Sequence, residues 1–453
     1  METNMTQGKP MGIILRFTLP ILLGNVFQTL YNMVDTIIVG RFVGQHALAG
    51  VGSTGTIMFL VLGFSNGMTT GFSVLTSHKY GAGNWEETRR SVANGILLSI
   101  MVAMIMTLIS MSFMDKLLHL MNTPDDIYRD AYNYIIIICA GITPTIFYNL
   151  FSSFLRAIGN SRTPLYFLIF SSVLNVFLDL FFIVGLGLET RGAALATILS
   201  QGISALGTLI YILMRVEVLT PRRTHWRLNK EDSKFQLLVG LPMALQYGIT
   251  ASGTVIMQSA INVFGSAAVA AYTAANKVQS ILMQGHLSVG LAMAAYSGQN
   301  FGAGNIGRIR QGTRDAMKYV LVYSVLASAF AIFGLPHVLP LFFSGDVDMA
   351  SVIAYARPYI YECASCYIPL GMIFVYRNTM QGCGYGFEAM CLGFVELAAR
   401  STASFLAIYL YIYPLATGAD ASAWLSTGIF AYIMYRYVMR KICRKREEQE
   451  MQE

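Results

Sequence analysis

The feature that most constrains this chain is a succession of apolar runs, each long enough to cross a bilayer. A membrane-spanning helix needs about 20 predominantly apolar residues. The 453 residues hold twelve such runs: 13–39, 46–77, 91–114, 131–155, 164–187, 191–215, 235–264, 267–299, 318–344, 352–380, 386–413 and 420–440. Only 12% of the residues are charged, against roughly 25% in soluble proteins. The sequence therefore predicts an all-α integral membrane protein, because helices satisfy their own backbone groups in lipid.

The basic residues predict the orientation of these spans. Lys and Arg gather at the N-terminus, in alternate loops and in the C-terminal tail. By the positive-inside rule, this places both termini in the cytoplasm of a multi-pass protein of the cytoplasmic (inner) membrane. The net charge of +7 is thereby explained without nucleic acid. We expect the tail from Arg436 to Arg446 to lie against anionic lipid headgroups. No cleavable signal peptide is expected, since the first apolar run is itself long enough to span.

The chain also repeats itself at about half its length. Tyr80–Asn84 (YGAGN) returns as Phe301–Asn305 (FGAGN), 221 positions later. Because each half holds an even number of spans, the two halves enter the membrane in the same orientation, as parallel repeats do. We predict a six-helix bundle at 1–215, a cytoplasmic linker at 216–234, and a second six-helix bundle with the basic tail at 235–453.

Prolines recur at matching places in the two halves. Pro20 and Pro242 lie in the first span of each half, and Pro144 and Pro369 lie in the fourth. Each proline removes one backbone hydrogen bond and allows a bend. Paired interruptions of this kind point to transport proteins, and Pro20 is the expected hinge.

Polar residues in the first half are predicted to meet at one depth. Asp35 and Asp179 each lie 15 residues beyond a proline near the cytoplasmic side, which is about 22 Å along a helix. Asn175 and Thr197 fall on neighbouring levels, and Gln28, Tyr31 and Asn149 are supporting candidates. Such oxygens suit Na⁺ or a shared proton, and an acid inside a span is usually functional. The alternative is a protonated Asp that bonds to a neighbouring helix.

The second half carries a different set of charges within its spans. Lys277, Glu362, Glu396 and Arg400 provide two positive and two negative groups. Glu396 and Arg400 have the i, i+4 spacing of an intrahelical ion pair. We predict a structural charge network here, with contact to substrate as the alternative.

Several stretches resemble the multidrug and toxic compound extrusion (MATE) family over nearly the whole chain. They are Leu19-Pro20, Val34–Gly40, Tyr80–Asn84, Asn175–Asp179 and Gly192–Thr197. The resemblance implies a V-shaped pair of six-helix bundles that exports drug-like, often cationic, compounds in exchange for H⁺ or Na⁺.

The branch it looks most similar to is the DinF-like one. That resemblance implies an ion site in the first bundle, formed here by Tyr31, Asp35, Asn175, Asp179 and Thr197, with Asn149 nearby. It also implies that the first span bends near Pro20. The NorM-like branch uses acids in the second bundle, whereas Tyr247–Ala251 contains none.

These observations favour a secondary antiporter for small organic molecules rather than an enzyme. The chain has no Gly-x-x-x-x-Gly-Lys-Ser/Thr loop for ATP, so we expect no ATPase subunit, no cofactor beyond the coupling ion, and a monomer. A lipid-linked oligosaccharide flippase is the alternative; it would need several cations facing its cavity, and the first half offers few. A channel or receptor is a third class, which fits the paired proline bends less well.

Overall fold

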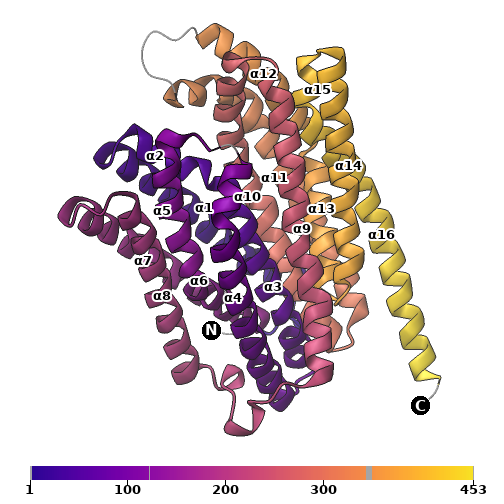
Figure 1. Cartoon of the computed structure of the whole chain (residues 1–453). Helices are drawn as coiled ribbons and strands as arrows, with labels where there is room; N and C mark the ends of the chain where they lie inside the picture. Colours follow the sequence, from indigo (N-terminus) through magenta and orange to yellow (C-terminus); the bar gives the residue numbers. More distant parts are fainter. Residues whose placement is uncertain (1–2, 122, 343–348, 452–453) are drawn as a thin grey trace. The chain divides into compact units, whose positions relative to one another are not determined.

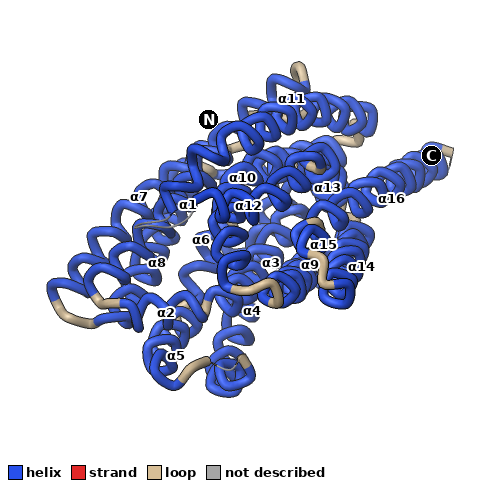
Figure 2. Tube along the Cα trace, turned by 90° about the horizontal axis from the view of Figure 1, so that it is seen from above, coloured by secondary structure: helices blue, strands red, loops and turns tan. Residues whose placement is uncertain are grey.

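In the computed structural model, residues 3–121, 123–342 and 349–451 are described (Figure 1). Within these ranges the regular structure is helical and contains no strand (Figure 2). The helices in chain order are α1 Pro10–Phe42, α2 Gln45–Ser53, α3 Gly55–Gly81, α4 Trp85–Leu120, α5 Asp125–Ala140, α6 Ile142–Ala157, α7 Arg162–Asp179, η1 Leu180–Gly185, α8 Glu189–Arg215, η2 Glu217–Leu219, η3 Arg223–His225, α9 Lys230–Asn262, α10 Ser266–Gly302, α11 Ile306–Val338, η4 Leu339–Phe342, α12 Met349–Ser365, α13 Tyr367–Gly382, α14 Gly386–Leu410, α15 Tyr413–Thr417 and α16 Ala419–Glu450.

Many of these helices can cross a membrane. By length and apolar composition seven single helices qualify among the described residues, and the bent pair α5 and α6 makes up to eight. The other predicted spans coincide with α9, α10, the α12 and α13 pair, and α16; α12 and α13 are only 17 and 16 residues long. An all-α integral membrane fold is therefore confirmed, while the count of twelve spans stays a prediction.

Packing divides the chain into two compact units. Unit 1 comprises Met1–Thr6, Leu19–Tyr247 and Gly298–Gly304, and unit 2 comprises Gln7–Thr18, Gly248–Ser297 and Asn305–Glu453. The first part of α9, from Lys230 to Tyr247, thus packs with unit 1, although it extends past the predicted linker into the predicted second bundle. The bundle boundaries at 215 and 235 stay a prediction along the sequence.

The internal repeat is visible in the helix boundaries. Helices α3 and α10 end at Gly81 and Gly302, and α4 and α11 begin at Trp85 and Ile306. Both offsets are the 221 positions of the sequence repeat. The two halves therefore share one order of helices, as the repeat predicted.

The repeated Gly-Ala-Gly-Asn segment has a clear physical function. Gly83 and Gly304 both adopt a φ of 73°, which favours glycine because it has no Cβ. A Cβ on Gly81 would clash with the carbonyl oxygen of Gln299, and one on Gly302 with that of His78. In unit 1 these two helix ends approach so closely that only glycine fits at each.

The paired prolines of the fourth spans coincide with real breaks. Helices α5 and α6 meet at Gly141 with a bend of 50°, three residues before Pro144. Helices α12 and α13 are interrupted at Cys366, three residues before Pro369. By contrast, α1 and α9 run on through Pro20 and Pro242, so a bend at Pro20 stays a prediction.

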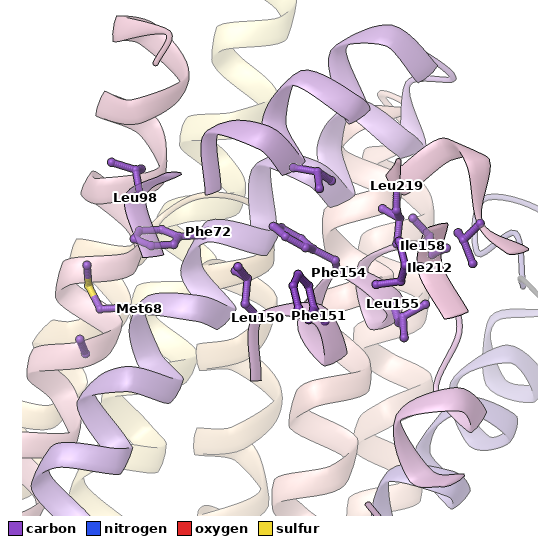
Figure 3. Close-up of a cluster of buried hydrophobic side chains, with 13 residues drawn as sticks. Met68, Phe72, Leu98, Leu150, Phe151, Phe154, Leu155, Ile158, Ile212 and Leu219 are labelled. Carbon is purple, nitrogen blue, oxygen red and sulfur yellow. The ribbon is translucent and has the colours of Figure 1, made fainter. Parts of the chain in front are cut away.

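Unit 1 is held by a continuous apolar core. Figure 3 shows side chains from α3, α4, α6 and α8, and from Ile158 and Leu219, packed together in one buried cluster. Phe72, Phe154, Leu150 and Ile158 are fully buried there. Burial of a large apolar side chain contributes roughly 1.5–3 kcal/mol, so this layer fixes how these helices pack.

The predicted linker is anchored to α4 by polar contacts. Asn94 donates to Gln236 at 2.7 Å and accepts from the backbone N–H of Asn229 at 3.0 Å. Arg90 forms an ion pair with Asp232 at 2.8 Å. The side chains of Asn94 and Gln236 are fully buried and hydrogen-bonded, as buried polar groups must be.

Candidate cation site

Helices α1 and α7 bring the two predicted carboxylates of unit 1 together. Close packing of α1 on α7 is possible because Gly24 has no side chain: a Cβ there would lie 3.2 Å from Cδ2 of Leu168. Asp35 is three turns further along α1, and Asp179 is the last residue of α7. Both helices are apolar on most positions, so these acids interrupt membrane-spanning segments.

The carboxyl groups of Asp35 and Asp179 lie close enough to interact electrostatically with each other. Asp179 is fully buried. Neither of its carboxyl oxygens accepts a hydrogen bond from a donor in the described part of the chain, and the same is true of Oδ1 of Asp35. Two facing carboxylates repel each other in a low dielectric. One of them must therefore carry a proton, or a cation must lie between them.

Asn175 contributes a second group without a partner. It lies one turn before Asp179 on the same face of α7 and is 1% exposed. Neither its amide oxygen nor its amide nitrogen is hydrogen-bonded among the described residues. A buried amide left unpaired costs about 1–3 kcal/mol. Its oxygen is thus available to an ion, and its N–H groups to an ionised carboxylate.

Thr197 and Gln201 lie one turn apart on α8. The hydroxyl of Thr197 donates to the carbonyl of Ala193 at 3.0 Å, so its oxygen keeps a lone pair for another ligand. The side-chain oxygen of Gln201 is buried and lacks a donor within the described ranges. Gln201 was not among the predicted residues, although its i, i+4 relation to Thr197 was a usable signal.

Two tyrosines surround the carboxyl pair. Tyr31 of α1 and Tyr134 of α5 both lie close enough to interact electrostatically with Asp35 and Asp179. Tyr134 is 5% exposed and escaped the sequence analysis. Its burial singles it out only in the structure, where it bears the one hydroxyl among the buried residues of α5.

The apolar surroundings of the pair are equally specific. Tyr134 belongs to a cluster with Ile38, Val39, Ile138 and Ile183. These side chains remove water from one side of the carboxyl groups. A water-poor wall strengthens any charge interaction at the pair.

The backbone changes its winding directly after Asp179. Segment η1 is π-helical, with a hydrogen bond from the N–H of Leu186 to the carbonyl of Phe181 at 3.0 Å. Single π-turns are rare and occur often at functional sites. The sequence gives no local signal for this turn.

Two supporting candidates lie apart from these contacts. Gln28 is exposed on α1, and Asn149 is partly buried on α6. Neither is hydrogen-bonded to the carboxyl pair within the described ranges.

The predicted charges of the second half fall into two groups. Arg400 forms ion pairs with Glu396 and with Asp420, both at 2.8 Å. Asp420 was not among the predicted residues. Lys277 is exposed, and Glu362 is partly buried with one unpaired oxygen; neither forms an ion pair among the described residues. A role for these four charges stays a prediction.

Comparison with known proteins identifies the family. The MatE family model matches residues 20–181 and 242–418, which together make up most of the chain and cover both halves of the repeat. The chain belongs to the MATE family. It is therefore a multi-pass membrane transporter and not an enzyme.

Relatives and solved structures agree with this assignment. The chain is 29% identical over 440 residues to the probable multidrug resistance protein YpnP of Bacillus subtilis, covering 96% of each chain. It is 30% identical over 302 residues to YoeA of the same organism, covering 65% of each. A transporter of the MOP superfamily from Pyrococcus furiosus has a similar fold, with a TM-score of 0.89 at 22% identity over 97% of this chain and 98% of that one.

Proposed function

We propose that this MATE transporter is an antiporter that exports drug-like or toxic organic compounds in exchange for H⁺ or Na⁺. It would work as a monomer in the cytoplasmic membrane with both termini in the cytoplasm. The observation that carries the proposal is the facing pair Asp35 and Asp179, which lacks a cationic partner among the described residues.

An uncompensated acidic pair suits a coupling ion because its cation has to come from outside. A permanent ion pair with Lys or Arg would hold the charge in place. A proton satisfies the pair by a hydrogen bond between the two carboxyl groups. Na⁺ would find hard oxygens on both carboxylates, on Asn175 and on Thr197.

Occupancy of the pair changes the charge buried between α1 and α7. We infer that the released or bound cation alters how α1 packs on α7. Pro20 lies four turns before Asp35 and offers no backbone N–H, so α1 can bend there at low cost. This links the ion to a movement of the span, and it is the step that an antiporter needs.

The names of the relatives support an organic substrate. YpnP and YoeA are called probable multidrug resistance proteins, and a relative from Shewanella oneidensis, 23% identical over 381 residues, is called a FAD transporter. The substrate class is thus drug-like organic molecules first, with a flavin dinucleotide as a useful comparator.

The decisive experiment is efflux from proteoliposomes under separately imposed pH and Na⁺ gradients. A fluorescent cationic dye and FAD serve as the two substrates. We expect dye efflux with one of the two gradients and none without a gradient. The same measurement on Asp179→Asn should show only the passive leak of empty liposomes.

The matched control is Asp125→Asn, which makes the same chemical change at an exposed position in the first turn of α5. It should transport like the parent protein. Gradient-driven efflux that is undiminished in Asp179→Asn would refute the ion site. Current that flows without any substrate would instead indicate a channel.

A further inference from the structure

Unit 2 contains a pocket of about 630 Å³ that the proposed transport cycle does not use. It lies between α11, α13 and α16, and this volume is in the usual range for ligand sites. One face of α11 and one face of α16 line the pocket, with lining residues at i, i+3 and i+4 spacing on each helix. The charged and aromatic lining residues that matter here are Arg310, Arg314, Tyr376, Tyr435, Arg436 and Arg440.

Four arginines line this pocket without an acidic partner. Arg310, Arg314, Arg436 and Arg440 form no ion pair within the ranges that the structure describes. Neighbouring acids are engaged elsewhere, since Asp315 pairs with Lys318 at 2.9 Å and Glu448 with Arg444 at 2.9 Å. Four uncompensated positive charges around one hollow favour an anion strongly.

The remaining wall is aromatic and fixed. Tyr376 and Tyr435 stack with ring centroids 4.8 Å apart and an interplanar angle of 29°, and each is 8% exposed. Tyr432 holds Arg436 by accepting a hydrogen bond from its Nη1 at 2.8 Å. The pocket thus combines guanidinium groups with a preformed apolar floor.

We propose that this pocket binds an anionic phosphate group, borne either by a phospholipid headgroup or by a soluble phosphate ester. Arginine is the side chain best suited to phosphate, because its planar fork donates two parallel hydrogen bonds. Several arginines together match the multiple oxygens of one phosphate. The tyrosines offer the apolar contact that a glycerol backbone and the start of an acyl chain require.

The position of the pocket favours the lipid as the source. It lies towards the basic C-terminal end of α16 and the start of α11, at the membrane face that the charge distribution predicts to be cytoplasmic. That leaflet is rich in anionic lipids. A bound headgroup would join α11 to α16 and so stabilise their packing in unit 2.

The test uses the full-length protein in a neutral detergent and follows its midpoint of thermal unfolding. The ligands are dioctanoyl phosphatidylglycerol, dioctanoylglycerol, which lacks the phosphate, and inorganic phosphate. We compare the double variant Arg436→Gln/Arg440→Gln with the control Arg444→Gln/Lys445→Gln. The control removes the same charge from the same helix outside the pocket.

Phosphatidylglycerol should raise the midpoint of the parent and of the control alike. In Arg436→Gln/Arg440→Gln the concentration for half the shift should rise at least tenfold. If inorganic phosphate alone gives the same arginine-dependent shift, the source is a soluble phosphate. An equal shift with dioctanoylglycerol, or an equal loss in both double variants, would overturn the proposal.

A second measurement needs no variant. Nη2 of Arg310 contacts Sγ of Cys443 at 2.9 Å, so a ligand on Arg310 should slow maleimide labelling of Cys443. Cys391, which is also partly exposed, is the internal reference. Protection of Cys443 alone supports the pocket. Labelling of both cysteines at unchanged rates under saturating phosphatidylglycerol and phosphate contradicts it.

Discussion

Two buried acidic sites of this transporter differ in one respect, the presence of a built-in cation. In unit 1, Asp35 and Asp179 face each other, and no Lys or Arg among the described residues pairs with them. In unit 2, Glu396 and Asp420 share Arg400, with both contacts at 2.8 Å. Asp35 and Asp179 thus lack a counter-charge, and we call this pair the open site. Glu396 and Asp420 share the counter-charge of Arg400, and we call this group the closed site.

We expect the presence or absence of this arginine to distinguish acids that stabilise the fold from acids that exchange a cation. A carboxylate that is paired with a buried arginine keeps its charge, since breaking such a pair costs about 3–5 kcal/mol. A carboxylate pair without an arginine is satisfied only when it acquires a mobile cation. The two halves thus share one order of helices, yet the facing acids Asp35 and Asp179 of the first half lack the Lys or Arg partner that Glu396 and Asp420 share in the second, among the described residues.

The largest expected effect is the loss of efflux when either acid of the open site is replaced. Asp35→Asn and Asp179→Asn should each reduce gradient-driven efflux to the passive leak, because either change removes one of two facing acids. The double variant should be no worse, since residues that act as one unit are not additive. Efflux from proteoliposomes measures this, and a double variant that is clearly weaker than both single ones would show that the acids act separately.

The second expected effect is the loss of stability when the arginine of the closed site is replaced. Arg400→Gln should destabilise the protein by about 3–5 kcal/mol, because it leaves Glu396 and Asp420 without a counter-charge. The midpoint of thermal unfolding in detergent measures this. Arg444→Gln is the control, since its pair with Glu448 is largely exposed and worth at most about 1 kcal/mol. A midpoint unchanged in Arg400→Gln would end the contrast between the two sites.

The third expected effect is a change in stability whose sign differs between the two sites. Asp179→Asn should leave stability unchanged or raise it by about 1 kcal/mol, because it relieves repulsion between two buried carboxylates. The gain should increase with pH, as the parent pair loses its shared proton. Thermal unfolding at pH 6 and pH 8.5 measures this. A loss of stability similar to that of Arg400→Gln would mean that the pair is structural.

The smallest effect concerns the wall of the open site. Tyr134→Phe removes a hydroxyl near the acids while keeping the ring in its apolar cluster. We expect the interaction of this hydroxyl with the acids to contribute about 1 kcal/mol, the size of a neutral hydrogen bond. The cation concentration that gives half-maximal efflux should therefore rise about fivefold, with the maximal rate kept. Tyr128→Phe, at the exposed end of α5, is the control and should leave this concentration unchanged.

Much of the fold follows from the sequence because its signals are local. The length of an apolar run predicts a spanning helix, and Pro144 within the fourth span predicts the interruption at Gly141, three residues before it. The Gly-Ala-Gly-Asn repeat predicts equal helix ends, since a φ of 73° at Gly83 and Gly304 suits glycine. Each of these depends on neighbours within a few residues along the chain.

For the candidate site, the depth of each acid in the membrane can be predicted from the sequence, but the direction of its side chain cannot. Counting along α1 and α7 places Asp35 and Asp179 at similar heights in the membrane. It cannot show that their carboxyl groups face each other, because that depends on how each helix is rotated about its axis. Tyr134 and Asp420 were missed for the same reason: each acts on residues about a hundred or about twenty positions away.

By itself, then, the sequence determined that this protein is a helical membrane transporter of two related halves with acids in its first and fifth spans. Only the tertiary structure decided which acids are left without a counter-charge and which arginines gather around a pocket. The reason is physical: hydrophobicity and backbone preference act along the chain, whereas electrostatic compensation depends on distances between helices.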